Sequence, residues 1–133
     1  MTPQIGEVVA SETVRVERVH LVMYAGASGD FNPIHWNETF AKAVGLPDVI
    51  AHGMFTQAQL GRLLVAWAGD PARILSFSVR FSAPVVVREA GGAKLALQAT
   101  VAGVEGDVVT LALTATCGGT DVVKDAVATV RVV

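Results

Sequence analysis

The sequence predicts an α+β fold in which a curved antiparallel sheet of about five strands wraps around one long central helix. Three observations favour this fold. The run from Gly53 to about Trp67 is apolar over most of its helical circumference, four segments of alternating apolar residues follow it, and short glycine-containing turns separate those segments. A helix that is apolar on most sides has to be buried, and a strongly twisted sheet can cover it.

The first half of the chain is predicted to be mainly helical. A short strand around residues 14–16 opens the fold, because valines there alternate with a charged residue. The apolar spacing of residues 19–27 predicts a helix that is ended by glycines. A second, short helix over residues 38–44 follows Asn37, whose side chain can cap its first turn.

The second half is predicted to be a series of strands joined by short turns. Apolar residues alternate with polar or small ones in residues 75–81, 95–101, 109–115 and 122–132. Glycines supply the turns between them, at positions 91–92, 103–106 and 118–119. Connections this short require antiparallel neighbours. A curved antiparallel sheet around a central helix is a hot-dog fold, and we expect residues 1–133 to form a single domain of this type.

A second subunit is expected to complete the fold. An open sheet has edge strands with unpaired backbone groups, and joining two sheets edge to edge protects them. The hydrophobic fraction of 52% is high for a globular protein, which favours a large apolar interface. We therefore expect dimerisation through sheet edges, with either an identical chain or a different hot-dog subunit as the partner.

Composition excludes several classes of protein. The net charge is −2 with no basic run, so nucleic-acid binding has no electrostatic support. No stretch approaches the ~18 consecutive apolar residues of a membrane-spanning helix. Cys117 is the only cysteine, which excludes an intrachain disulfide and favours a reducing compartment. The first residues also lack a signal-peptide pattern, so a cytoplasmic location is predicted.

The segment Gly29–His35, which reads GDFNPIH, contains the first candidate catalytic residues. Asp30 and His35 are five residues apart, a spacing that would place them on different faces of a helix. Pro33 disfavours a helix here and permits a turn, in which both side chains can converge on one point. A carboxylate beside an imidazole suits acid–base chemistry, because imidazole titrates near neutral pH.

The segment Ala51-His52-Gly53-Met54 lies where the central helix begins. The first N–H groups of a helix have no intrahelical partners, and the helix dipole adds partial positive charge there. Gly53 has no side chain to block an approaching ligand. Its N–H is therefore a candidate donor to an oxygen atom that gains negative charge during a reaction.

These motifs resemble the signature of the MaoC-like (R)-specific enoyl-thioester hydratase/dehydratase family. The resemblance rests on residues 29–35 and 51–54, and the later segments Val79-Arg80-Phe81 and Pro84-Val85 are similar to the Arg-Phe…Pro-Val strand of that family. Here residues 86–89 are expected to continue this strand. The similarity covers nearly the whole chain, and its motifs most resemble the catalytic subunit of actinobacterial (3R)-hydroxyacyl-[acyl-carrier-protein] dehydratases, which work beside a non-catalytic hot-dog partner.

The resemblance implies an activity and a set of residue roles. Enzymes of this family interconvert trans-2-enoyl and (3R)-hydroxyacyl thioesters of coenzyme A or acyl carrier protein in fatty acid metabolism, without a cofactor or a metal. By resemblance, Asp30 and His35 hold the water. His35 exchanges the proton at C2, and Asp30 exchanges a proton with the hydroxyl group. The Gly53 N–H forms the oxyanion hole, and Asn32 orients the loop.

Three further residues are predicted to bind or orient the substrate, namely His52, Met54 and Thr56. Two of them have an alternative interpretation that is the more common one for such residues. His52 can be a structural histidine that fixes the start of the helix, and Thr56 can be a buried hydroxyl bonded to the backbone. His35, His52 and Asp30 could in principle converge on a metal ion, but the resemblance implies metal-free chemistry.

Two other functions fit the same fold. One is an acyl-binding or partner-stabilising subunit of a heterodimeric dehydratase, although such a subunit would not need the Asp30–His35 pair. The other is a hot-dog thioesterase, which by resemblance places a carboxylate on or near the central helix. This chain has no Asp or Glu between Asp48 and Asp70, which disfavours a thioesterase.

Overall fold

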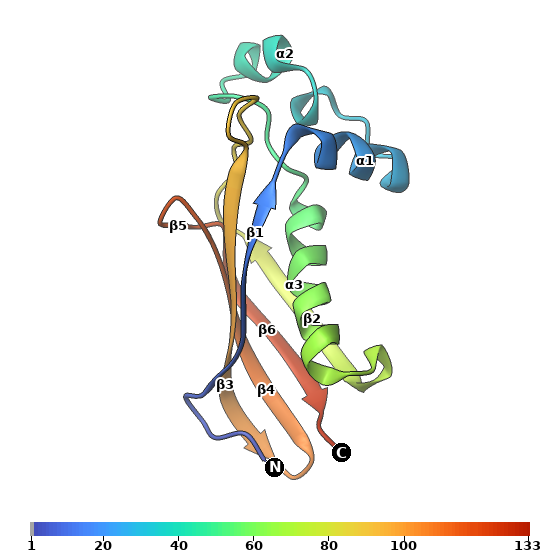
Figure 1. The fold of residues 1–133 in the computed structure, drawn as a ribbon, viewed down its shortest axis with the longest axis vertical. Helices are drawn as coiled ribbons and strands as arrows, with labels where there is room; N and C mark the ends of the chain where they lie inside the picture. The colour runs from blue at the N-terminus through green and yellow to red at the C-terminus, as the bar shows by residue number, and fades with distance from the viewer. Residues whose placement is uncertain (1) are drawn as a thin grey trace.

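The computed structural model describes residues 2–133, which form a six-stranded antiparallel sheet with one long helix along it (Figure 1). The main strands lie in the order β1-β3-β4-β6-β2, and the short β5 pairs with β4. The elements in chain order are β1 (Val8–Val16), α1 (Arg18–Ser28), η1 (Pro33–His35), α2 (Glu38–Ala43), α3 (Gly53–Ala68), η2 (Pro71–Arg73), β2 (Ile74–Phe81), β3 (Ala93–Glu105), β4 (Val108–Cys117), β5 (Thr120–Asp121) and β6 (Val123–Arg131).

The core lies between α3 and the inner face of the sheet. The long strand β3 alternates buried and exposed residues over most of its length, as expected for a sheet with one covered face. Leu60 and Leu64 of α3 are buried against this face together with Leu95 and Leu111. The predicted hot-dog fold is therefore confirmed, and the sheet is curved and open.

Helix α3 is buried on one side only. Its buried residues are Phe55, Thr56, Leu60, Leu63 and Leu64, all on the side toward the sheet. Met54, Ala58 and Arg62, on the other side, are exposed in the single chain. The expectation of cover on most sides is therefore not met in the single chain, because the sheet covers one side of α3 and the outer side stays exposed.

The two ends of the molecule differ in structure. Helices α1 and α2 lie together beyond the N-terminal end of α3, whereas both chain termini lie at the opposite end (Figure 1). Helix α1 directly follows β1, and Asn37 Oδ1 accepts a hydrogen bond from the Phe40 N–H, which caps α2 as predicted. None of the helices in residues 2–133 combines the length and apolar character needed to cross a bilayer.

Two strand predictions need correction. The opening strand begins at Val8, well before residue 14, because β3 pairs with it along its whole length even where apolar alternation is weak. Residues 86–89 do not continue β2, which ends at Phe81. Pro84 lacks a backbone donor and interrupts the strand. The chain then crosses to pair with residues 49–51, forming the bridge between Val86 and Ile50.

Gly91 and Gly92 form the predicted turn before β3 and provide a matched test of backbone packing. Both have positive φ, +89° and +62°. A Cβ on Gly92 would collide with the carbonyl oxygen of the buried Val16, whereas one on Gly91 would meet open space. We expect Gly91→Ala to lower the free energy of unfolding by about 1–2 kcal/mol, the cost of the left-handed conformation. Gly92→Ala should lower it by roughly 3–5 kcal/mol. Urea denaturation of both variants checks this, and equal losses would contradict it.

Candidate active site

Asp30 and His35 converge at the turn that follows α1. The helix ends at Gly29, whose φ of 77° turns the chain away. Pro33 then starts the short 3-10 helix η1, which includes His35. His35 Nε2 lies 3.9 Å from Asp30 Oδ2, which is too long for a direct hydrogen bond. The gap leaves both atoms available to bind one oxygen atom between them.

Asn32 holds the shape of this turn. Its side-chain Oδ1 accepts a hydrogen bond from the Ile34 N–H at 3.2 Å, and its own N–H donates to Asp30 Oδ1 at 3.1 Å. These bonds position the Asp30 carboxylate through one oxygen and leave Oδ2 toward His35. Asn32 therefore bonds to residues on both sides of it within the turn.

The orientation of the His35 ring is set by a backbone carbonyl. Its Nδ1 lies 2.6 Å from the carbonyl oxygen of Ile50, which can only accept, so Nδ1 carries the hydrogen. Neutral His35 therefore presents an unprotonated Nε2 to Asp30. Ile50 also donates its N–H to the Ile34 carbonyl oxygen at 3.1 Å, so both backbone groups of this residue hold η1.

The environment lowers the pKa of His35 below its ordinary value of 6.5. Burial is the main cause, and the nearby His52 adds to it. The hydrogen bond to Ile50 and the charge of Asp30 act in the opposite direction. The imidazole is therefore neutral at physiological pH and available as a base.

His52 packs directly against His35. The two rings are stacked with centroids 3.7 Å apart and an angle of 21° between their planes. His52 is 2% exposed, and its Nε2 donates to the Asp30 carbonyl oxygen at 3.1 Å. The side chain therefore ties the start of α3 to the Asp30 backbone. The Tyr24 ring of α1 also contacts His52, with the two ring centroids 4.7 Å apart.

The same stacking disfavours a shared metal ion. Ligand atoms of Asp30, His35 and His52 lie within 4.8 Å of one another. A metal ion binds in the plane of an imidazole ring, and the planes of these two rings are nearly parallel and stacked 3.7 Å apart. They do not converge on one tetrahedral centre. The arrangement is better suited to proton transfer than to metal binding.

A pocket of about 390 Å³ opens beside Gly53. Thr56 also lines this pocket, and the Phe81 ring forms another wall. Among residues 2–133, neither a carbonyl nor a side chain accepts the Gly53 N–H. This N–H belongs to the residue that follows His52, whose ring stacks on that of His35. Ile50 joins the two parts of the site, because it lines the pocket and bonds His35.

Not every predicted site residue belongs to this group. Met54 is 56% exposed on the outer side of α3 and does not line the pocket beside Gly53. Asp30 and His35 also do not line it in the single chain, and Asp30 is half-exposed. Two contributors were not anticipated from the sequence, the carbonyl of Ile50 and the ring of Tyr24. A backbone carbonyl has no residue-type signal by which it could have been found.

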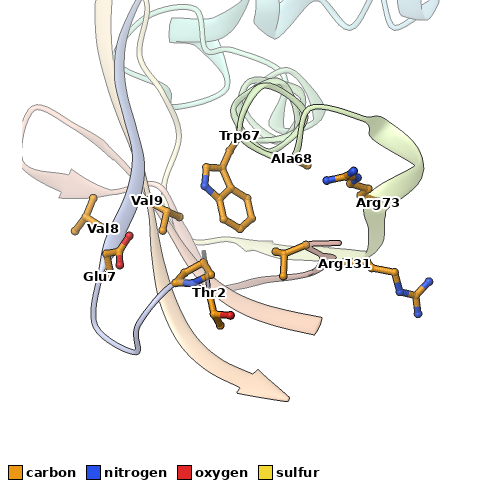
Figure 2. Close-up of a pocket in the computed structure, with 10 residues that line it drawn as sticks. Thr2, Glu7, Val8, Val9, Trp67, Ala68, Arg73 and Arg131 are labelled. Atoms are coloured by element: carbon orange, nitrogen blue, oxygen red, sulfur yellow. The ribbon is translucent and has the colours of Figure 1, made fainter. Parts of the chain in front are cut away.

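A second pocket, of about 340 Å³, lies at the far end of α3 (Figure 2). Trp67 projects there from the last turn of the helix toward the strands, with Arg73 nearby and Glu7 on the opposite side (Figure 2). Helix α3 contains 16 residues. At 1.5 Å per residue they span about 24 Å, which places this pocket outside the Asp30–His35 site.

Fold and site together define a hot-dog protein in which a carboxylate and an imidazole converge at one turn and the first N–H of the central helix has no acceptor among the described residues. The MaoC like domain model matches residues 2–118, and the chain therefore belongs to this family. It is 42% identical over 79 residues to 3-hydroxyacyl-thioester dehydratase X of Mycobacterium tuberculosis, a match that covers 59% of this chain and 27% of that protein.

Two solved structures support the assignment. A MaoC-like dehydratase superimposes with a TM-score of 0.94 at 37% identity, covering 97% of this chain and 40% of the other. The R-hydratase PhaJ1 of Pseudomonas aeruginosa superimposes with a TM-score of 0.83 at 26% identity, covering 97% and 81%. The chain thus spans about a quarter of the length of the mycobacterial relative and 81% of the R-hydratase chain.

Proposed function

We propose that this chain catalyses the reversible hydration of trans-2-enoyl thioesters to (3R)-hydroxyacyl thioesters in fatty acid metabolism. The observation on which the proposal depends is the 3.9 Å gap between Asp30 Oδ2 and the Nε2 of His35, whose Nδ1 carries the hydrogen. The free N–H of Gly53 belongs to the residue that follows His52, and the His52 ring stacks on His35. The names of the mycobacterial dehydratase and the R-hydratase support the same reaction.

In the direction of hydration, a water molecule binds between Asp30 and His35. Its oxygen forms a bond to C3 of the enoyl group while Asp30 takes one of its protons. The electron pair of the double bond moves onto the thioester oxygen, whose negative charge the Gly53 N–H stabilises. The proton then passes from Asp30 to His35 Nε2 and on to C2, which leaves both residues as they began.

Dehydration is the reverse. Neutral His35 takes the C2 proton, the C3–O bond breaks, and the proton reaches the leaving hydroxyl group through Asp30. Both directions require a neutral His35 that carries its hydrogen on Nδ1.

The other residues of the site bind the substrate or hold the pair. Thr56 and Phe81 line the space for the acyl group, and His52 fixes the Asp30 backbone. Water and the thioester are the only reactants, so the proposal needs no cofactor or metal.

The pH dependence of catalysis follows from the lowered pKa of His35. Because the base must be neutral, kcat/KM should fall as the pH drops, with a midpoint below 6.5. Above that midpoint the rate should be constant until another group titrates. His20→Gln, which changes the remaining histidine outside the site, should leave the midpoint in place. A midpoint above 6.5 in a pH–rate profile would contradict the assignment of His35 as the base.

The proposal includes a second hot-dog subunit. Strand β2 lies at an edge of the sheet and exposes Leu75 and Phe81, each nearly half accessible. Phe81 also lies against Gly53, so a partner on this edge would shape the pocket as well as cover apolar surface. A homodimer or a heterodimer satisfies this requirement. A chain that serves as a partner-stabilising subunit is the alternative function, and it is favoured only if the purified chain is inactive.

One assay separates these functions. The purified chain is incubated with crotonyl- and dodecenoyl-thioesters of coenzyme A and of acyl carrier protein, and the loss of enoyl-thioester absorbance is followed. We expect hydration, with the molecular mass in solution reporting whether the active species is a homodimer. Inactivity with every substrate would contradict an independent enzyme.

The proposal also includes a cytoplasmic location. The single cysteine, Cys117, and the thioester substrates together support it.

A further inference from the structure

Arg18, the first residue of α1, contacts segments of the chain that are distant from it in the sequence. Its Nη2 lies 2.6 Å from Asp48 Oδ1, and its Nε donates to the Val87 carbonyl oxygen at 2.6 Å. A longer contact of 3.4 Å reaches Glu38 at the start of α2. Asp48 is 5% exposed, and its Oδ1 also accepts the Val49 N–H at 2.8 Å. The buried Asp48 carboxylate thus forms an ion pair with Arg18 and a hydrogen bond to the backbone, just before the segment that leads to α3.

The segments that Arg18 joins form a short two-stranded ladder. The Val87 N–H donates to the Val49 carbonyl oxygen at 2.9 Å, and the Ala51 N–H donates to that of Val85 at the same distance. Ile50 lies between these bonds and bridges Val86. Arg18 holds one strand through Asp48 and the other through Val87. It therefore fixes the register of the ladder at the end next to Ile50.

The ladder in turn holds the catalytic imidazole. Ile50 points its N–H at the Ile34 carbonyl oxygen and receives the Nδ1 hydrogen of His35 on its own carbonyl oxygen. Only the hydrogen bond at Nδ1 keeps that nitrogen protonated and Nε2 free in the neutral ring. A shift of the Ile50 carbonyl would weaken this bond, and both tautomers of His35 would then be populated.

We infer that the Arg18–Asp48 ion pair is a positioning device, which aligns the Ile50 carbonyl and thereby keeps His35 in the tautomer that acts as the base. The inference rests on the proposed function and assigns to it two positioning residues outside the pocket. Neither touches the reacting atoms. Their effect on catalysis is expected to pass through one backbone carbonyl.

Asp48→Asn is the main test, because it removes the charge and keeps the size of the side chain. We expect kcat to fall by roughly ten- to hundredfold, the range for a small misplacement of a catalytic group, while KM changes by less than about threefold. In nitrogen-15 NMR spectra of His35, the wild type should show a protonated Nδ1 and a bare Nε2. The variant should show a mixture of the two tautomers.

Two controls isolate the pair. Asp107→Asn breaks a 3.1 Å contact between the β3–β4 turn and Arg131, the last residue of β6. It should change neither the His35 tautomer nor kcat. Arg88→Gln removes the exposed, 3.6 Å partner of the same Asp48 carboxylate and should have little effect. If Asp48→Asn does not fold, Arg18→Lys retains a positive charge near Asp48 but lacks the Nε donor to Val87. It should show the same tautomer mixture.

The outcomes separate positioning from stability and from the reaction itself. A folded Asp48→Asn or Arg18→Lys variant with the wild-type tautomer would overturn the inference, even if its melting temperature were lower. The NMR measurement needs no substrate. If the wild type hydrated none of the thioesters and the tautomer still changed in the variants, the proposed reaction would fail and the positioning role would stand.

Discussion

His35→Asn is expected to lower kcat by roughly 10²- to 10⁴-fold, the usual contribution of a general base. The amide nitrogen of asparagine takes the place of Nδ1 and can still donate to the Ile50 carbonyl oxygen. Asparagine has no group, however, that can accept a proton from C2. The loop should therefore keep its shape while the chemistry is lost. Steady-state rates with a trans-2-enoyl thioester, and a circular dichroism spectrum like that of the wild type, check both parts.

Asp30 provides the companion variant. Asp30→Asn should reduce kcat to a similar extent, because the amide cannot take a proton from water. The double variant should be little worse than either single one, since the two side chains act on the same proton path. His20→Asn is the matched control outside the site and should leave kcat unchanged. Fully multiplicative losses in the double variant would show that Asp30 and His35 act independently, against the proposed mechanism.

Gly53→Ala is expected to lower kcat/KM by roughly 10²- to 10³-fold, comparable to the loss of one oxyanion-hole donor. A Cβ on Gly53 would lie 2.9 Å from Cε2 of Phe81, closer than unstrained carbon atoms approach. Either the methyl group fills the space through which a thioester oxygen reaches the N–H, or the Phe81 ring is displaced into the pocket. Rates with a short enoyl thioester measure the effect with the least contribution from the acyl chain.

Gly61 supplies the matched control in the same helix. A Cβ there would lie 3.5 Å from the Phe77 ring, an ordinary van der Waals contact. Gly61→Ala should keep kcat/KM and raise the stability by up to about 1 kcal/mol, because alanine favours the helix. If Gly53→Ala retained the wild-type rate, the Gly53 N–H could not be the donor to the thioester oxygen.

The sequence predicted those parts of the molecule whose physical causes are local. Apolar spacing marked α3, and Pro33 marked the turn that brings Asp30 and His35 within 3.9 Å. Asn37 was identified as a cap because asparagine is favoured just before a helix, where its side-chain oxygen accepts a hydrogen bond from a first-turn N–H. Each of these features depends on residues that are close together along the chain.

Features that depend on distant segments were not predictable in the same way. The pairing of Val86 with Ile50 joins residues far apart in the sequence, and it replaced the expected continuation of β2. The role of the Ile50 carbonyl could not be read from residue type, since every residue has one. Met54 follows Gly53 in the motif, yet successive helical residues point in different directions, and it faces away from the pocket.

The most direct test of the paired action of Asp30 and His35 is hydration of a trans-2-enoyl thioester in heavy water, followed by stereochemical analysis of the product. We predict a (3R)-hydroxyacyl thioester with one deuterium at C2 from the wild-type chain, and formation of this product by His35→Asn at a rate lower by at least about a hundredfold. A (3S) product from the wild type, or labelled product formed by His35→Asn at an unchanged rate, would contradict the mechanism.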